Sequence, residues 1–419
     1  MKLKIALTLG VSALAAAPAF ADKSAVLTNY ADIALAKYED SLSAAQTLQA
    51  AVDTLIADPS AEALEAAKSA WLASRPAYQQ TEVYRFGNAI VDDWEGKVNA
   101  WPLDEGLIDY VDASYGGPTD ENEYAALNVV ANPMFNLSGS DIDASTITPA
   151  LLEEALHEAD GVESNVATGY HAVEFLLWGQ DLNGFGPGAG ARPWTDYAQG
   201  DACTGGNCDR RGQYLKAATD LLVSDLEWMV SQWTADGAAR AEVLADEAAG
   251  ITTILTGMGS LSYGEQAGER MKLGVLLNDP EEEHDCFADN THNSHFYDAL
   301  GIRNVYLGSY TRADGTVVSG PSLSELVADA DPALDAEMRG KLDATMFEML
   351  ELKVAAEKGM AYDMMLERGN EAGAALINGA VDALVDQTRS IERVVAALGV
   401  DAIEFEGSDS LDNPNAVFE

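Results

Sequence analysis

Apolar side chains recur at helical spacing along most of this chain, and this pattern restricts the fold more than any other feature. Alanine, a strong helix former, is frequent in the same stretches. Alternating patterns between tight turns, which are typical of strands, are almost missing. The stretches at helical spacing are 24–57, 60–80, 210–234, 237–259, 332–358 and 369–398. The sequence therefore predicts an all-α fold of packed antiparallel bundles.

Local signals predict where helices start and where the chain leaves them. Ser60 and Thr148 each stand where a side chain can cap a following helix, and the residues after Thr148 predict a helix over 151–159. Residues 183–211 are rich in Gly, Pro and Asp, so we expect an excursion over the surface. A second irregular stretch is expected over 278–321.

The length of the chain favours two domains. A chain of 419 residues is too long for one compact helical core and long enough for two. The predicted segments are a signal peptide at 1–21, an N-terminal helical bundle at 22–209, a C-terminal helical bundle at 210–400 and a loose acidic tail at 401–419.

The N-terminus predicts export. Lys2 and Lys4 give a basic start, residues 5–17 are apolar but too few to span a bilayer, and 19–21 form the small-x-small pattern that signal peptidase cuts. We expect cleavage after Ala21 and a mature protein in the periplasm, with association with the outer membrane as the alternative. No cysteine near Ala21 can accept a lipid anchor, and no later apolar run is long enough for a transmembrane helix.

The charge of the chain excludes one class of partner. Its formal net charge is -45, which repels phosphate backbones and argues against nucleic-acid binding. The acids are spread along the whole chain, so a solvated surface typical of a salt-rich habitat explains them better than a store of cations.

The three cysteines predict one local disulfide. Cys203 and Cys208 enclose two glycines that let a tight loop close, and an exported protein folds in an oxidising compartment. A soft-metal site is the alternative, which the absence of histidine from this loop disfavours. Cys286 is left over, and we expect a buried small apolar residue rather than a reactive thiol.

One short stretch concentrates the chemistry. In a helix, His171 and Glu174 lie one turn apart on the same face, so an imidazole and a carboxylate converge as in metal-binding bundles. This pair suits Zn, Fe or Mn. Spacing alone, however, favours a histidine that is merely hydrogen-bonded by its helix neighbour.

The surrounding residues resemble a known family. The stretch 169–179 contains Gly-x-His-x-x-Glu and resembles the signature of the imelysin family, which includes imelysin peptidases and the iron-regulated protein A group. The likeness extends over nearly the whole mature chain and continues at 80–87, 99–110, 268–271 and 289–293. It implies an all-helical fold of two bundles, with the signature helix facing a cleft.

The resemblance also makes acids in the other matched stretches site candidates. It makes Glu82 a candidate metal ligand and Arg85 the cleft charge that orients it, although a same-helix ion pair is their ordinary explanation. Asp104 and Glu105 follow a Trp-Pro turn, where one carboxylate can cap the next helix and the other can reach a metal. Asp104 is the candidate ligand and Glu105 the cleft residue.

The second half supplies three further cleft candidates. Glu269 and Arg270 form an interdomain ion pair or, alternatively, bind an anion or substrate. His295 precedes Asp298 by three residues, which echoes the signature spacing and indicates a diverged duplication. The alternative is that His295 only hydrogen-bonds a loop.

Two functions of different classes follow. The first is a periplasmic metal-binding protein for iron acquisition or iron response, with His171, Glu174, Glu82 and Asp104 as ligands, iron as the favoured metal, and envelope iron-uptake components as partners. The single imidazole among carboxylates suits ferric iron. The alternative is an imelysin-type metallopeptidase that uses zinc, with Glu174 as the catalytic base. The chain has neither His-Glu-x-x-His nor His-x-x-Glu-His, so a peptidase needs ligands from remote positions.

Overall fold

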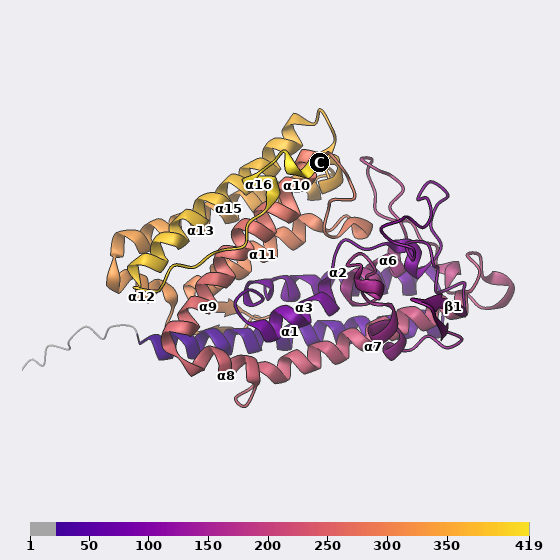
Figure 1. The fold of residues 1–419 in the computed structure, drawn as a ribbon, viewed down its shortest axis with the longest axis horizontal. Helices are drawn as coiled ribbons and strands as arrows, with labels where there is room; N and C mark the ends of the chain where they lie inside the picture. Colours follow the sequence, from indigo (N-terminus) through magenta and orange to yellow (C-terminus); the bar gives the residue numbers. More distant parts are fainter. Residues whose placement is uncertain (1–21, 419) are drawn as a thin grey trace, which may run out of the picture.

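Helices in two lobes make up the molecule (Figure 1). The computed structural model describes residues 22–418, so the predicted signal peptide lies outside the described residues. The first lobe, indigo through magenta to pink in Figure 1, contains α1 to α8, and the second, orange to yellow, contains α9 to α16. The strands within 22–418 form two short hairpins, β1–β2 and β3–β4. The all-α prediction is confirmed.

The elements of the first lobe have the following bounds, with η marking short 3-10 or π segments. They are α1 Lys23–Ala57, α2 Ala61–Gln79, η1 Glu82–Tyr84, α3 Ala89–Asn99, α4 Glu105–Ile108, β1 Met134–Leu137, β2 Ser140–Asp143, α5 Pro149–Leu151, η2 Leu152–Leu156, η3 Ala159–Gly161, α6 Gly169–Trp178, η4 Trp194–Asp196, η5 Gly200–Ala202, α7 Cys208–Trp233 and α8 Ala238–Ala245.

The elements of the second lobe complete the chain. They are α9 Glu247–Ser260, the π-helix η6 Leu261–Lys272, α10 Leu273–Leu277, η7 Cys286–Ala288, α11 Thr291–Leu307, β3 Ser309–Thr311, β4 Val317–Ser319, α12 Leu323–Ala330, α13 Pro332–Glu357, α14 Tyr362–Leu366, α15 Glu371–Ala397, α16 Asp409–Asp412 and η8 Ala416–Phe418.

The first lobe is built around α1, which packs against both α2 and α7. Tyr30, Tyr38, Tyr84 and Trp233 pack their rings together in its core, with the Tyr30 and Tyr84 centroids 4.7 Å apart. The stretch 210–234, predicted as the first helix of the second domain, forms α7. This helix packs in the first lobe. The apolar face of α1 has room for two partners, so this lobe extends past the predicted boundary at 209.

The second lobe joins α13, α15, η6 and α11 around a smaller core. A 17-residue helix, α11, forms inside the stretch 278–321 that was expected to be irregular. It packs against α2 of the first lobe, where Gly301 lies against the backbone of Gln80. The larger apolar core runs from the first lobe into α9, α11 and α12, so the two lobes share buried contacts.

Two of the predicted helices are divided. The stretch 237–259 forms α8 and α9, because Asp246 interrupts it and caps α9 by accepting a hydrogen bond from the Ala249 N–H. The expected helix at 151–159 is a single α-turn that continues as the π-segment η2. Ser60 and Thr148 cap their helices as predicted.

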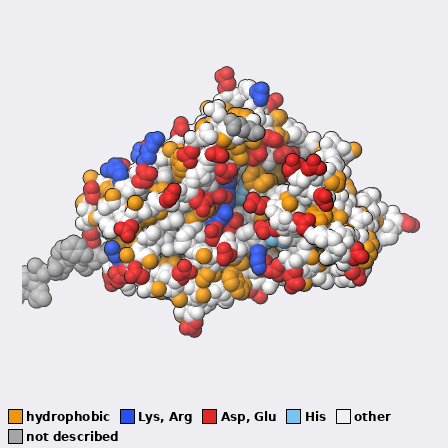
Figure 2. All heavy atoms as spheres, in the orientation of Figure 1, with side chains coloured by type: hydrophobic (Ala, Val, Ile, Leu, Met, Phe, Trp, Pro, Cys, Tyr) orange, Lys and Arg blue, Asp and Glu red, His pale blue; other side chains and the backbone are white. Residues whose placement is uncertain are grey.

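The surface is acidic across the whole visible face (Figure 2). Several basic side chains, in contrast, are buried: Lys37, Arg75, Arg192, Arg211 and Arg270. Buried acids accompany them, among them Glu82, Asp109 and Asp285, so the interior carries charges of both signs. Among residues 22–418, no helix combines the length and the apolar character needed to cross a bilayer.

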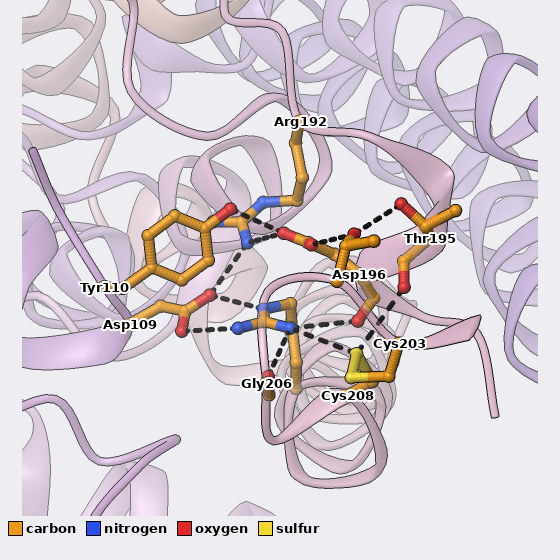
Figure 3. The surroundings of a disulfide bond; sticks show 10 residues. Asp109, Tyr110, Arg192, Thr195, Asp196, Cys203, Gly206 and Cys208 are labelled. Atoms are coloured by element: carbon orange, nitrogen blue, oxygen red, sulfur yellow. Dashed lines mark hydrogen bonds and ion pairs between the residues drawn. A yellow bond between two sulfur atoms is a disulfide. The ribbon is translucent and has the colours of Figure 1, made fainter. Parts of the chain in front are cut away.

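The predicted disulfide between Cys203 and Cys208 is present (Figure 3). It lies beside a buried ion network in which Arg192 and Arg211 both pair with Asp109. Arg192 also pairs with Asp196, at 3.1 Å. These ion pairs hold the irregular stretch 183–211 against the core. Its Gly-, Pro- and Asp-rich composition did not predict this attachment.

The C-terminal tail is packed, unlike the loose tail that its acidity predicts. Small residues of α9 and η6 leave room for it: Phe405 lies against Gly259, and Ser408 against Gly268. The Glu406 N–H donates to the Ser260 hydroxyl at 3.1 Å. Backbone contact with a stripe of glycines thus holds this segment despite its charge.

Replacing a glycine of this stripe by alanine should weaken the packing of the C-terminal tail. A β-carbon at Gly264 would lie 2.5 Å from the Glu406 carbonyl oxygen, so Gly264→Ala is expected to destabilise the protein by about 1–3 kcal/mol. Gly340, exposed in α13 with nothing near its missing β-carbon, is the matched control, and Gly340→Ala should stabilise by about 0.4–1 kcal/mol. Urea unfolding measures both, and equal effects would contradict the packing.

Candidate metal centre

The signature helix α6 is fixed at its first residue. Gly169 has φ +79° and lies against the backbone of Val98 in α3, where any side chain would collide. Only glycine meets both conditions, which explains its place in the Gly-x-His-x-x-Glu pattern. Every residue of α6 is buried, so His171 and Glu174 face the interior.

Glu174 holds the ring of His171. Its Oε2 lies 2.9 Å from His171 Nδ1, while its Oε1 accepts the Ala288 N–H at 2.9 Å. Both carboxylate oxygens are thus occupied, and His171 Nε2 has no hydrogen-bond partner among the described residues. When Nδ1–H donates to Glu174, the lone pair of Nε2 is free to bind a metal.

Two residues from the second lobe complete a cluster with His171. His284 and Asp285 precede η7, and the His171 and His284 rings meet edge to face with centroids 4.7 Å apart. One ligand atom from each of His171, His284 and Asp285 lies within 4.8 Å of the others. All three residues are at most 1% exposed. The cluster therefore lies between the lobes and away from bulk water.

Asp285 is oriented by a buried arginine. Arg75 in α2 donates to Asp285 Oδ1 at 2.9 Å and to Asn99 Oδ1 at 2.8 Å. Asn290 and Ser294 both donate to Asp285 Oδ2. The Arg75–Asp285 pair, fully buried on both sides, joins α2 to the loop that carries His284.

Burial and Arg75 set the protonation of the cluster. Burial, with Arg75 acting in the same direction, lowers the pKa of His171 to about 3, and burial also lowers the pKa of His284 well below its usual value. Burial opposes ionisation of Asp285, but the charge of Arg75, together with hydrogen bonds from Ser294 and Asn290, outweighs burial and lowers the pKa of this carboxyl. Neutral imidazoles beside a carboxylate are the forms that bind metals.

An acidic pocket of about 340 Å³ lies beside the cluster. Its lining includes Trp101, whose ring centroid is 5.8 Å from that of His284. Its acidic residues are Asp104, Glu105, Asp181 and Glu281, and no basic side chain lines it. Figure 2 shows histidine and basic side chains within a central groove that acids border. The four acids of the 340 Å³ pocket make it attractive to cations.

The other predicted site residues of the first lobe lie outside the cluster. Glu82 pairs with Arg270 at 2.6 Å. Asp104 accepts hydrogen bonds from Tyr115 and from the more distant Ser164. Neither acid belongs to the close group that His171 forms with His284 and Asp285. Their role as metal ligands stays a prediction.

The remaining cleft candidates divide between buried and exposed positions. Arg85 pairs with Asp92 at 2.9 Å and is partly exposed, whereas Glu105 is buried at the pocket wall. Glu269 is exposed, and its neighbour Arg270 is buried. His295 is buried next to Tyr362, with ring centroids 5.1 Å apart, and both its ring nitrogens lack partners among the described residues.

His284 and Asp285 were not among the site residues predicted from the sequence. The expectation of a single imidazole near Glu174 is corrected, because a loop more than a hundred residues later in the chain brings a second one. The rarity of histidine was the available signal, since the chain contains five.

Comparisons with known proteins identify the relatives of this fold. The imelysin family model matches residues 34–391. A 72-residue stretch is 33% identical to iron-regulated protein A of Synechococcus elongatus, and it spans 17% of this chain and 20% of that protein.

Two solved structures share the fold. One, described as an iron-regulated protein A precursor of Parabacteroides distasonis, has a TM-score of 0.63 and 20% identity over 92% of this chain and 97% of its own. The other, an imelysin-like protein of Psychrobacter arcticum, has a TM-score of 0.57 and 15% identity over 91% and 98%.

Breaking the buried ion pair should cost far more than breaking a surface one. Arg75→Met leaves Asp285 charged and unpaired, with an expected loss of about 3–5 kcal/mol of unfolding free energy. The control is Arg303→Met, which removes a partly exposed pair with Asp343 and should cost about 0–1 kcal/mol. Urea unfolding compares them, and a small loss for Arg75→Met would show that water reaches the pair.

His295 should make stability depend on pH. Burial, with Arg270 in the same direction, lowers its pKa from 6.5 to about 3, so its contribution is present above pH 6.5 and is lost as pH falls from there. Relative to His295→Gln, the wild type should lose roughly 1.4 kcal/mol per pH unit below 6.5, or about 2 kcal/mol at pH 5. Urea unfolding at pH 7 and 5 tests this, and a difference independent of pH would refute it.

Proposed function

Because the chain belongs to the imelysin family, we propose that it is a periplasmic metal-binding protein whose ion is held by His171, His284 and Asp285. The supporting observation is the placement of two neutral imidazoles and a carboxylate within 4.8 Å, in the interior between the lobes.

The donor set fits a metal ion. His171 Nε2 and His284 Nδ1 are buried nitrogen atoms without hydrogen-bond partners among the described residues. Glu174 acts as the residue that orients His171 through Nδ1, an arrangement common among metal-binding histidines. Glu174 was predicted as a direct ligand, and its hydrogen bonds favour this supporting role.

Two imidazoles change the expected metal. A His₂-carboxylate set is typical of Fe(II) sites and also suits zinc, whereas ferric iron favours oxygen-rich ligands. Two of the relatives carry the name iron-regulated protein A, which favours iron and a role in iron acquisition or response. Envelope iron-uptake components are then the expected partners.

A metallopeptidase of the imelysin type is the alternative. Burial raises the pKa of Glu174 well above its usual value, which suits a group that moves protons beside a metal. A polypeptide, however, cannot reach ligands that are at most 1% exposed unless the lobes separate. A small ion needs no such opening, so binding is the favoured function.

Metal content tests the proposal directly. The purified wild type should contain about one iron or zinc ion per chain by elemental analysis, and a His171→Ala, His284→Ala double variant should contain almost none. His157→Gln is the control, because His157 lies apart from the cluster and contacts Thr168. This variant should keep the metal.

Incubation with an unfolded protein separates the two functions. No cleavage by either the wild type or the double variant is expected for a binding protein. Cleavage that the double variant loses would favour the peptidase, and equal metal content in all variants would contradict the assigned ligands.

A further inference from the structure

Three carboxylates converge beside the metal centre without belonging to it. Glu283, Asp289 and Asp363 each have an oxygen within 4.8 Å of the other two. Glu283 and Asp289 stand on either side of η7, and Asp363 lies on α14 from a later part of the second lobe. Packing, rather than local sequence, therefore brings these acids together.

Two of the three carboxylates are buried, and none of them has a basic partner among the described residues. Glu283 and Asp363 are each 1% exposed, and Asp289 is partly exposed. Both oxygens of Asp363, Oε2 of Glu283 and Oδ1 of Asp289 have no hydrogen-bond partner among residues 22–418. No ion pair joins any of the three to a described lysine or arginine. Three such acids together are costly, because burial and mutual repulsion both penalise their charge.

We propose that Glu283, Asp289 and Asp363 bind a calcium-type cation at a site separate from the histidine cluster. A bound divalent cation supplies the charge that the protein does not. The donors are carboxylate oxygens alone, which hard cations prefer, and no imidazole or thiol belongs to the group.

The spacing favours calcium over magnesium. Calcium binds oxygens at about 2.3–2.6 Å in flexible shells, so oxygens up to 4.8 Å apart can share one ion. Magnesium requires near-ideal octahedral geometry at about 2.0–2.1 Å. The partly exposed Asp289 leaves one side open to water ligands and to entry of the ion.

Calcium at this site would order the loop of the metal centre. Glu283 immediately precedes His284, so the two sites hold adjacent residues of one segment. An ion bound to Glu283 and Asp289 would restrain that segment from both ends. Occupation of the site would then pre-form the position of His284 and Asp285.

Calorimetric titration of chelator-treated full-length protein with CaCl₂ tests the proposal. Asp363→Asn, which keeps the shape and removes one charge, should weaken calcium binding at least tenfold. Glu367→Gln removes an exposed charge from the same region and should bind like the wild type. The His171→Ala, His284→Ala double variant should also retain a calcium site, so failure of the proposed metal-centre function does not decide this result.

Thermal unfolding gives a second readout that does not depend on calorimetric heat. In chelator, Asp363→Asn should be at least as stable as the wild type because it relieves repulsion, whereas calcium should raise the Tm of the wild type and not of the variant. Calcium binding that Asp363→Asn leaves unchanged would indicate attraction to the acidic surface only, and would overturn the proposal. Absence of calcium binding by the wild type would overturn it as well.

Discussion

The ion pair between Arg75 and Asp285 is the interaction on which the rest of the site depends. It lies between α2 and the loop before η7, with both side chains fully buried. The positive charge of Arg75 keeps Asp285 ionised and also helps to keep His171 neutral. A single arginine thus joins the lobes and sets the protonation states that a metal site requires.

Much of the fold follows from periodicity and capping. The predictions for 24–57 and 60–80 match α1 and α2 closely, because strong helix formers and a serine cap act locally. The helix α11 was not predicted, since its first turn is made of polar residues and packing against α2 stabilises it. The packed tail was missed because its partners are glycines distant in sequence.

Half of the candidate site could be predicted from the sequence. His171 and Glu174 could be predicted because they share one helical turn and lie in a stretch that resembles the family signature. His284 and Asp285 reach them only through contact between the lobes, which no local spacing reveals. Glu82 was a candidate ligand because it lies in the stretch 80–87, which also resembles the family. Its pairing with Arg270, which comes from η6 in the other lobe, is likewise a tertiary contact.

The division of charge between surface and interior has a consequence for behaviour in salt. The formal charge of -45 is borne largely by exposed acids, while Arg75 and Arg270 are buried in ion pairs. Dissolved ions shorten the range of electrostatic forces in water to about 8 Å at physiological ionic strength and about 3 Å at 1 M, yet they hardly enter the interior. Concentrated electrolyte therefore removes the repulsion that loosens the molecule and spares the attractions that hold it together. A brine is a milder solvent for this protein than dilute buffer.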